Sequence, residues 1–210
     1  KAADTLDLGT ECVAIDSWMG DAHAGLHDTT VFEGFKRNLK NLFPKQKYIR
    51  SFFETAVECF ENGSIDLLHI DGLHTYDAVK GDFETWLPKM SDCGVIIFHD
   101  VNVYRKDFGV WRYWEELSKE YPSFSFMHSH GLGILYVGTQ ETPIKTILEQ
   151  LAKQPEIGKI MKAFAHGIGE TLIENARLNY ETAAELEHVS SKAAAELEHV
   201  SSKAAAELEH

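Results

Sequence analysis

Two short apolar runs, Ile65–Ile70 and Gly94–Phe98, each end directly in titratable side chains. Nearly continuous apolar runs of this length are typical of parallel strands that are buried on both faces. The titratable residues that follow the two runs are, in chain order, Asp71, His74, His99 and Asp100. Ligands of open α/β sheets bind just beyond the carboxyl ends of the strands. We therefore expect these four side chains to gather at one edge of a sheet.

The surrounding sequence alternates between helical and strand-like patterns. Apolar residues recur at helical spacing over residues 31–42, 75–87 and 109–120. Short apolar runs predict further strands at residues 12–15, 48–52, 124–128 and 133–137, the last two as an antiparallel pair. This order predicts an α/β fold: a Rossmann-like, doubly wound, mostly parallel sheet with an antiparallel terminal strand, followed by a long C-terminal helix.

The pattern divides the chain into an α/β domain at residues 1–138, a short helical connector at 139–168 and a long helix at 169–210. The last part repeats the sequence AAELEHVSSKA, which begins at Ala183 and again at Ala194. An apolar period of 11 residues favours a straight or slightly right-handed superhelix. Residues 181–210 are therefore expected to form a partner helix or a homo-oligomer contact, or else a lone solvated helix.

Charge and composition narrow the choice of partners. The formal net charge of −13 argues against nucleic acid or an anionic membrane as the main partner. The sequence has no apolar run near the roughly 20 residues that span a bilayer and no signal-peptide pattern, so we expect a cytoplasmic protein. It begins without Met, which is consistent with a fragment. The three cysteines, Cys12, Cys59 and Cys93, are widely spaced, and we expect them to be reduced and mostly buried.

Asp16 directly follows the first predicted strand. An acidic residue at the end of the second strand of nucleotide-binding α/β units commonly accepts hydrogen bonds from ribose hydroxyls. Ribose binding is one interpretation of Asp16, and the capping of a local turn is the other.

Asp71, His99 and Asp100 together offer a set of metal ligands. Magnesium prefers carboxylate oxygens and keeps several waters, whereas the imidazole of His99 is a better ligand for a transition metal. The alternative is that the two aspartates cap the helices that follow them. The sequence alone leaves both open.

His74 is a candidate general base, because a neutral imidazole can take a proton from a substrate hydroxyl. The N-terminus of the following helix disfavours the protonated ring. Helix capping or passive substrate contact is the alternative. His69 lies within the first apolar run, and we expect it to be a hydrogen-bonded core residue.

Four segments resemble the class I S-adenosylmethionine-dependent methyltransferases, in particular a bacterial O-methyltransferase group often fused to glycosyltransferases. They are VAIDSWMGDAHAG at 13–25, IDLLHIDGLHTYDAVKGDFETWLP at 65–88, GVIIFHDVNV at 94–103 and FGVWRYWEEL at 108–117. The resemblance covers about residues 1–138. It implies transfer of a methyl group from S-adenosylmethionine to a hydroxyl of a small molecule, such as a sugar unit.

The resemblance also implies roles at single positions. Asp16 matches the residue that binds the ribose of the cofactor, and Ser51, Phe52 and Phe53 match the wall around the adenine. Asp71 matches a residue shared by the cofactor site and the metal site, where Mg²⁺ or another divalent metal binds, and His99 and Asp100 match an acidic pair. His74 matches the catalytic base.

Two departures from the family pattern leave other functions open. The first strand and the glycine-rich loop that holds the methionine part of the cofactor are absent, and His99 stands where the family has an acid. One alternative is a degenerate methyltransferase-like module that serves assembly or tethering through its C-terminal helix. The other is a metal-dependent, hydroxylase-like protein built on Asp71, His99 and Asp100.

Overall fold

A computed structural model describes residues 8–21, 23, 25–43, 46–178 and 181–182. The chain divides into two compact units, Lys1–Gly158 and Lys159–His210. The repeats that begin at Ala183, and the contact expected of them, lie outside the described residues.

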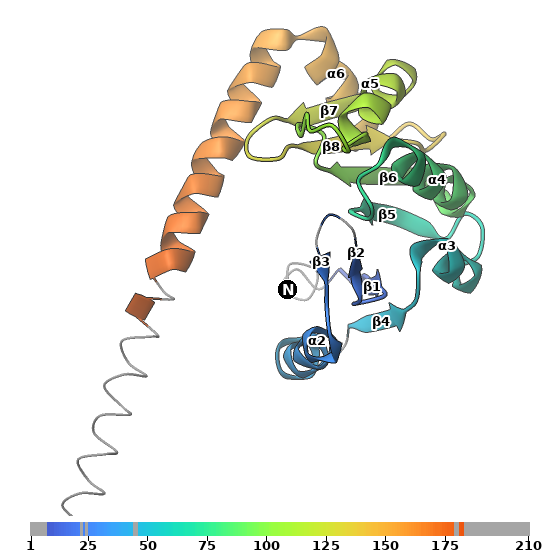
Figure 1. Cartoon of the computed structure of the whole chain (residues 1–210). Helices are drawn as coiled ribbons and strands as arrows, with labels where there is room; N and C mark the ends of the chain where they lie inside the picture. The colour runs from blue at the N-terminus through green and yellow to red at the C-terminus, as the bar shows by residue number, and fades with distance from the viewer. Residues whose placement is uncertain (1–7, 22, 24, 44–45, 179–180, 183–210) are drawn as a thin grey trace, which may run out of the picture. The chain divides into compact units, whose positions relative to one another are not determined.

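The first unit holds a four-stranded sheet in the order β5-β6-β8-β7 (Figure 1). The strands are β5 (Ile65–Ile70), β6 (Met90–His99), β7 (Ser123–Phe126) and β8 (Leu132–Tyr136). β5 and β6 are parallel, while β8 runs antiparallel to both β6 and β7. The predicted α/β class with a reversed last strand is confirmed, but β8 lies inside the sheet and β7 forms its edge.

A second, two-stranded sheet pairs β1 (Val13–Asp16) with β4 (Lys47–Arg50) in parallel. The crossover between them is α2 (Thr29–Leu42), whose N-cap residue Asp28 accepts a hydrogen bond from Thr30 N at 2.8 Å. In the described residues, β1 and β5 are each hydrogen-bonded to one neighbouring strand. The expected continuous sheet is therefore divided between β1 and β5.

Helices α4 (Tyr76–Trp86) and α5 (Val110–Glu120) cover one face of the four-stranded sheet. The register aligns Leu68, Ile96 and Leu135 across the sheet, and all three are buried on this face. Phe83 and Trp86 of α4 belong to the same hydrophobic core as these sheet residues. Gly133 of β8 allows the indole of Trp114 to pack closely, because an added Cβ would lie 2.7 Å from that ring.

The segment after β4 is only briefly helical. It contains only a short α3 (Phe53–Ala56) followed by a 3₁₀ turn, Val57–Cys59. The segment after β1 contains a small hairpin of β2 (Gly20–Asp21) and β3 (Gly25–Leu26). Backbone hydrogen bonds hold this hairpin together, and the spacing of apolar residues does not predict them.

The C-terminal part begins with α6 (Pro143–Lys153), which packs on β7 and β8. Residues 155–178 then form one helix, where the sequence predicted a short helix and a separate long one. Gly167 and Gly169 lie inside it without ending it. Within the described residues, no helix combines the length and the apolar character needed to cross a membrane.

Three predictions about burial are wrong. Leu67 is 61% exposed and His69 is also exposed, because their side chains lie on the face of β5 opposite to the helix-covered one. β5 is therefore buried on one face, and His69 is not a core residue. Cys12 and Cys59 are exposed and Cys93 is half-buried, and all three thiols are free. Cys12 directly precedes β1 and Cys59 ends the 3₁₀ turn, whereas Cys93 lies within β6.

Candidate active site

The loop that follows β5 carries two of the predicted side chains. Asp71 directly follows the last residue of the strand, and His74 lies three residues further on. Thr75 is the N-cap of α4, and its hydroxyl accepts a hydrogen bond from Ala78 N at 3.3 Å. The cap fixes where the helix begins, and so holds the half-buried ring of His74 directly before it.

The loop that follows β6 carries the other two. His99 is the last residue of the strand, and Asp100 adopts left-handed backbone with a φ of 61°. The amide of Asp100 donates to Gly131 O at 3.1 Å. This turn directs the Asp100 carboxylate inward, where its side chain is only 8% exposed. Aspartate is one of the few residue types that tolerate this backbone conformation.

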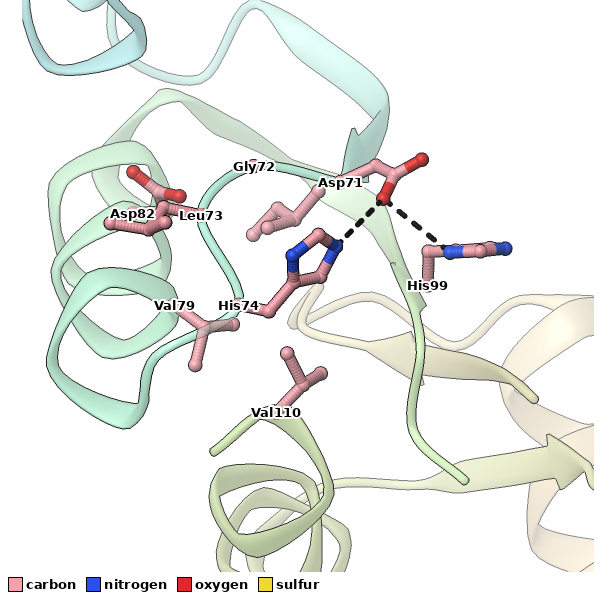
Figure 2. A pocket seen from close by; sticks show the side chains of 9 residues that line it. Asp71, Gly72, Leu73, His74, Val79, Asp82, His99 and Val110 are labelled. Atoms are coloured by element: carbon pink, nitrogen blue, oxygen red, sulfur yellow. Dashed lines mark ion pairs between the residues drawn. The ribbon is translucent and has the colours of Figure 1, made fainter. Parts of the chain in front are cut away.

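The four side chains converge at the carboxyl ends of β5 and β6. Figure 2 shows three of them, Asp71, His74 and His99. His74 Nε2 lies 2.9 Å from Asp100 Oδ2 and 3.8 Å from Asp71 Oδ1. His99 Nδ1 lies 2.9 Å from Asp100 Oδ1 and 3.4 Å from Asp71 Oδ1. Asp71 thus faces two imidazoles. Asp100, the buried centre of the cluster, also faces a third, because His130 Nδ1 lies 3.8 Å from Asp100 Oδ1.

The cluster shifts the proton affinities of its members. Hydrogen bonding to His74 lowers the pKa of Asp71, with a further contribution from the charge of His99, while partial burial opposes this. Asp71 in turn raises the pKa of His74, as does the charge of Asp100, again against partial burial. The sequence-based expectation for His74 invoked only the helix N-terminus, which acts in the opposite direction. The nearby carboxylates dominate because they are closer and carry full charges.

Two further residues of the site were not singled out from the sequence. His23, in the β2–β3 hairpin, places its Nδ1 3.3 Å from Nδ1 of His74. Phe108 stacks on both rings, with centroid distances of 4.9 Å to His23 and 4.7 Å to His74. Three separate loops therefore meet in one stack, and no local pattern in the sequence indicates that they do.

Backbone contacts hold this stack together. The amide of Gly109 donates to the carbonyl of His74 at 2.7 Å. A Cβ on Gly109 would lie 2.2 Å from the backbone nitrogen of Tyr76. A glycine is therefore required where the Phe108 loop approaches the start of α4. A small pocket beside it is lined in part by Asp71, His74 and Asp82 (Figure 2).

The residues expected to bind the cofactor lie along the other sheet. Asp16 ends β1, is exposed, and accepts a hydrogen bond from Trp18 N at 2.8 Å through Oδ1. Ser51 follows β4, and its amide donates to Asp16 O at 3.0 Å. Phe52 is exposed, whereas Phe53 stacks on the core residue Trp86 at 4.4 Å. Asp16, Ser51 and Phe52 thus form a local group, and Phe53 is engaged by the core.

The cluster has the donors of a divalent cation site. Asp71, His74 and Asp100 each offer one ligand atom within 4.8 Å of the other two. Asp100 Oδ1 and His99 Nδ1 are buried and make no well-formed hydrogen bond within the described residues, although 2.9 Å separates them. Buried lone pairs without a partner are costly, and a cation would satisfy them. The residues therefore fit a metal ion with mixed oxygen and nitrogen ligands.

Residues 1–101 match the family model of a methyltransferase domain. For this part of the chain, the match confirms the resemblance to the class I S-adenosylmethionine-dependent methyltransferases. The methyl donor of this class is S-adenosylmethionine.

Similar proteins extend the comparison beyond that range. An uncharacterized protein, y4gI, of Sinorhizobium fredii is 38% identical over 174 residues, which is 83% of this chain. The chain spans only 17% of the length of that relative.

Solved structures that are similar to this chain are more distant from it in sequence. SAH-bound methyltransferase PaMTH1 of Podospora anserina is 17% identical, with 63% of this chain and 62% of that chain covered and a TM-score of 0.43. Spermidine synthase of Thermotoga maritima is also 17% identical, with 64% and 55% covered and a TM-score of 0.41. Their low TM-scores carry no argument about activity.

Proposed function

We propose that this protein is an O-methyltransferase that transfers a methyl group from S-adenosylmethionine to a hydroxyl of a small molecule, with a sugar unit as the expected acceptor. The observation that carries the proposal is the pairing of His74 with the buried carboxylate of Asp100, at the strand edge where open α/β sheets bind ligands. A cytoplasmic location is part of the same proposal.

When bound, S-adenosylmethionine supplies an activated methyl group on a sulfonium, so the chain needs chiefly to align the acceptor and to remove one proton. His74 accepts that proton. Asp100 holds the ring through Nε2 and stabilises the positive charge that the ring acquires, which is the role of the carboxylate in other acid–histidine pairs. Asp16 binds the ribose, with Ser51, Phe52 and Phe53 near the adenine and Asp71 at the edge shared with the metal.

Asp71, His99 and Asp100 would hold a divalent cation in this proposal, and His74 would stay outside the ligand set. A metal-bound nitrogen must be free of its proton, whereas Nε2 of His74 faces a carboxylate, which offers only acceptors. A cation in this position would lower the pKa of a bound hydroxyl. The imidazole ligand favours a transition metal such as Zn²⁺ over Mg²⁺. Titration calorimetry with each ion separates these cases.

Cofactor binding is the first test. Calorimetry of the natural full-length protein with S-adenosylmethionine and S-adenosylhomocysteine should give saturable binding, and Asp16→Ala should weaken it. Transfer of radiolabelled methyl groups to a panel of hydroxylated sugars and phenols then identifies the acceptor class. No binding of either compound to the full-length protein would end the proposal.

A second function, assembly through the C-terminal helix, is favoured by one observation. The helix over residues 155–178 exposes large apolar side chains at helical spacing along one face: Ile157, Ile160, Phe164, Ile168 and Leu172. Exposed apolar faces of this kind mark association surfaces. Light scattering should show an oligomer that is lost in Phe164→Glu/Ile168→Glu or on removal of residues 181–210. A monomer of the unaltered protein would exclude this function.

A further inference from the structure

We propose that His130, on the loop between β7 and β8, is a ligand of the divalent cation, beside His99 and Asp100. This inference rests on the proposed cation site and adds to it a residue that the sequence did not single out. It starts from Asp100, whose two carboxylate oxygens face different groups. Oδ2 lies 2.9 Å from Nε2 of His74, whereas Oδ1 faces Nδ1 of His99 at 2.9 Å and Nδ1 of His130 at 3.8 Å. The ligands therefore gather on the Oδ1 side, away from His74.

Two buried atoms on this side need a partner. The side chain of Asp100 is only 8% exposed, and its Oδ1 has no well-formed hydrogen bond in the described part of the chain. Nδ1 of His99 is buried in the same way. Buried polar atoms that lack a partner destabilise a fold. A cation held between the two atoms would satisfy both, and the carboxylate would still face His74 through Oδ2.

The separations between the ligand atoms suit a shared ion. Imidazole nitrogens and carboxylate oxygens bind Zn²⁺ at about 2.0–2.2 Å, so two ligand atoms of one ion lie roughly 3–4 Å apart. The distances from Asp100 Oδ1 to the two imidazole nitrogens, 2.9 and 3.8 Å, agree with this spacing. The 3.4 Å between His99 Nδ1 and Asp71 Oδ1 also agrees with it. With His130, the set contains two imidazoles and two carboxylates, which suits Zn²⁺ better than Mg²⁺.

Hydrogen bonds hold the His130 loop against the turn that follows β6. The amide of Asn102 donates to His130 O at 2.8 Å, and the Asn102 side chain donates through Nδ2 to Met127 O at 2.8 Å. Gly131 has a φ of 85°, and a Cβ on it would lie 2.7 Å from Cβ of Asn102. The loop is thus fitted closely to this turn. The His130 side chain is 60% exposed, so its ring can turn toward an ion without displacing buried chain.

Packing alone is the other role that the contacts allow. The ring of His130 meets that of His99 edge to face, with centroids 6.3 Å apart and planes at 78°. His130→Phe separates the two roles, because phenylalanine keeps an aromatic ring but has no nitrogen that binds an ion. Loss of a residue that merely supports a ligand weakens metal binding by about 10- to 100-fold. Loss of a ligand should therefore raise the Kd for Zn²⁺ by at least about 10-fold.

Titration calorimetry of the full-length protein with Zn²⁺ measures this change. His128→Phe, on the same exposed loop, is the matched control and should keep the wild-type Kd. His130→Asp supplies a carboxylate oxygen in place of the nitrogen and should bind Zn²⁺ more tightly than His130→Phe. An unchanged or lower Kd in His130→Phe would overturn the inference.

X-ray absorption of the zinc-loaded protein counts the imidazole ligands and needs neither acceptor nor methyl donor. We expect two imidazoles in the wild type and one in both His130→Phe and His130→Asp. An equal number in the wild type and in His130→Phe would reject His130 as a ligand. If the wild type binds no Zn²⁺, the inference fails together with the cation site. The proposed methyl transfer is tested separately, by binding of S-adenosylmethionine and by labelling of the acceptor panel.

Discussion

His74 and Asp100 come from loops that follow two adjacent parallel strands, and their side chains meet at 2.9 Å although 26 positions separate them in the sequence. The parallel register of β5 and β6 brings the two loops together, since Ile70 is aligned with Phe98. The left-handed backbone of Asp100 then turns its carboxylate toward the imidazole.

Asp100→Asn should abolish most of the activity while leaving the fold intact. Asparagine tolerates the left-handed backbone at this position, but its amide lacks the charge that stabilises a protonated His74. We expect kcat for methyl transfer to fall by about 10²-fold or more, with binding of S-adenosylmethionine unchanged by calorimetry. Equal losses in kcat and in cofactor affinity would instead show that Asp100 belongs to the cofactor site.

Asp16→Asn should weaken cofactor binding without changing the thermal midpoint by more than a degree or two. A carboxylate that accepts from two ribose hydroxyls makes charge-assisted hydrogen bonds, and their loss costs about 1.5–3 kcal/mol, or roughly 10- to 100-fold in Kd. Asparagine keeps an oxygen for the amide of Trp18, so the turn after β1 should persist. An unchanged Kd would assign Asp16 to the turn alone.

Trp86 offers a matched pair of core substitutions. Its side chain is fully buried, and its indole N–H has no hydrogen-bond partner within the described residues. Trp86→Ala should reduce the free energy of unfolding by about 3–5 kcal/mol. Trp86→Phe should cost less than about 1.5 kcal/mol, because the smaller ring also removes an unsatisfied donor. Chemical denaturation measures both, and a cost above 3 kcal/mol for Trp86→Phe would contradict the absence of a partner for that N–H.

Asp82 should make stability fall as the pH rises. Burial, with a smaller effect of Glu54, raises the pKa of Asp82 from 3.8 to about 6. The folded state therefore holds the proton more tightly than the unfolded chain, and this contribution is complete below pH 3.8 and is lost as the pH rises through about 6.

Asp82→Asn should remove that dependence. After allowance for partial exposure, we expect it to be about 1 kcal/mol more stable than the wild type at neutral pH and equal to it in acid. Denaturant melts on both sides of the shifted pKa measure this difference. Asp107→Asn, on an exposed loop, is the control and should show no such change. A greater benefit in acid than at neutral pH would reverse the sign and refute the argument.

The sequence predicted the elements whose signals are local. The apolar spacing in α2, α4 and α5, and the titratable residues after β5 and β6, follow from residues a few positions apart. The burial of Leu67 and His69 was predicted wrongly because an apolar run does not say whether another element covers each face of the strand. The sequence did not indicate His23 and Phe108 as site residues, because they contact His74 only when loops that are distant in the chain come together. The N-terminus of the following helix also favoured a neutral His74, whereas the nearby carboxylates favour its charged form.

The backbone of Gly109 touches the start of α4 so closely that nothing larger than a hydrogen atom fits between them. Since the neighbouring Phe108 lines up two imidazoles, the spacing of the rings depends on this absence of a side chain. A methyl group there would clash with the backbone of Tyr76 and so would push the Phe108 ring and His74 apart. The least conspicuous residue of the cluster thus sets how precisely its reactive groups are aligned.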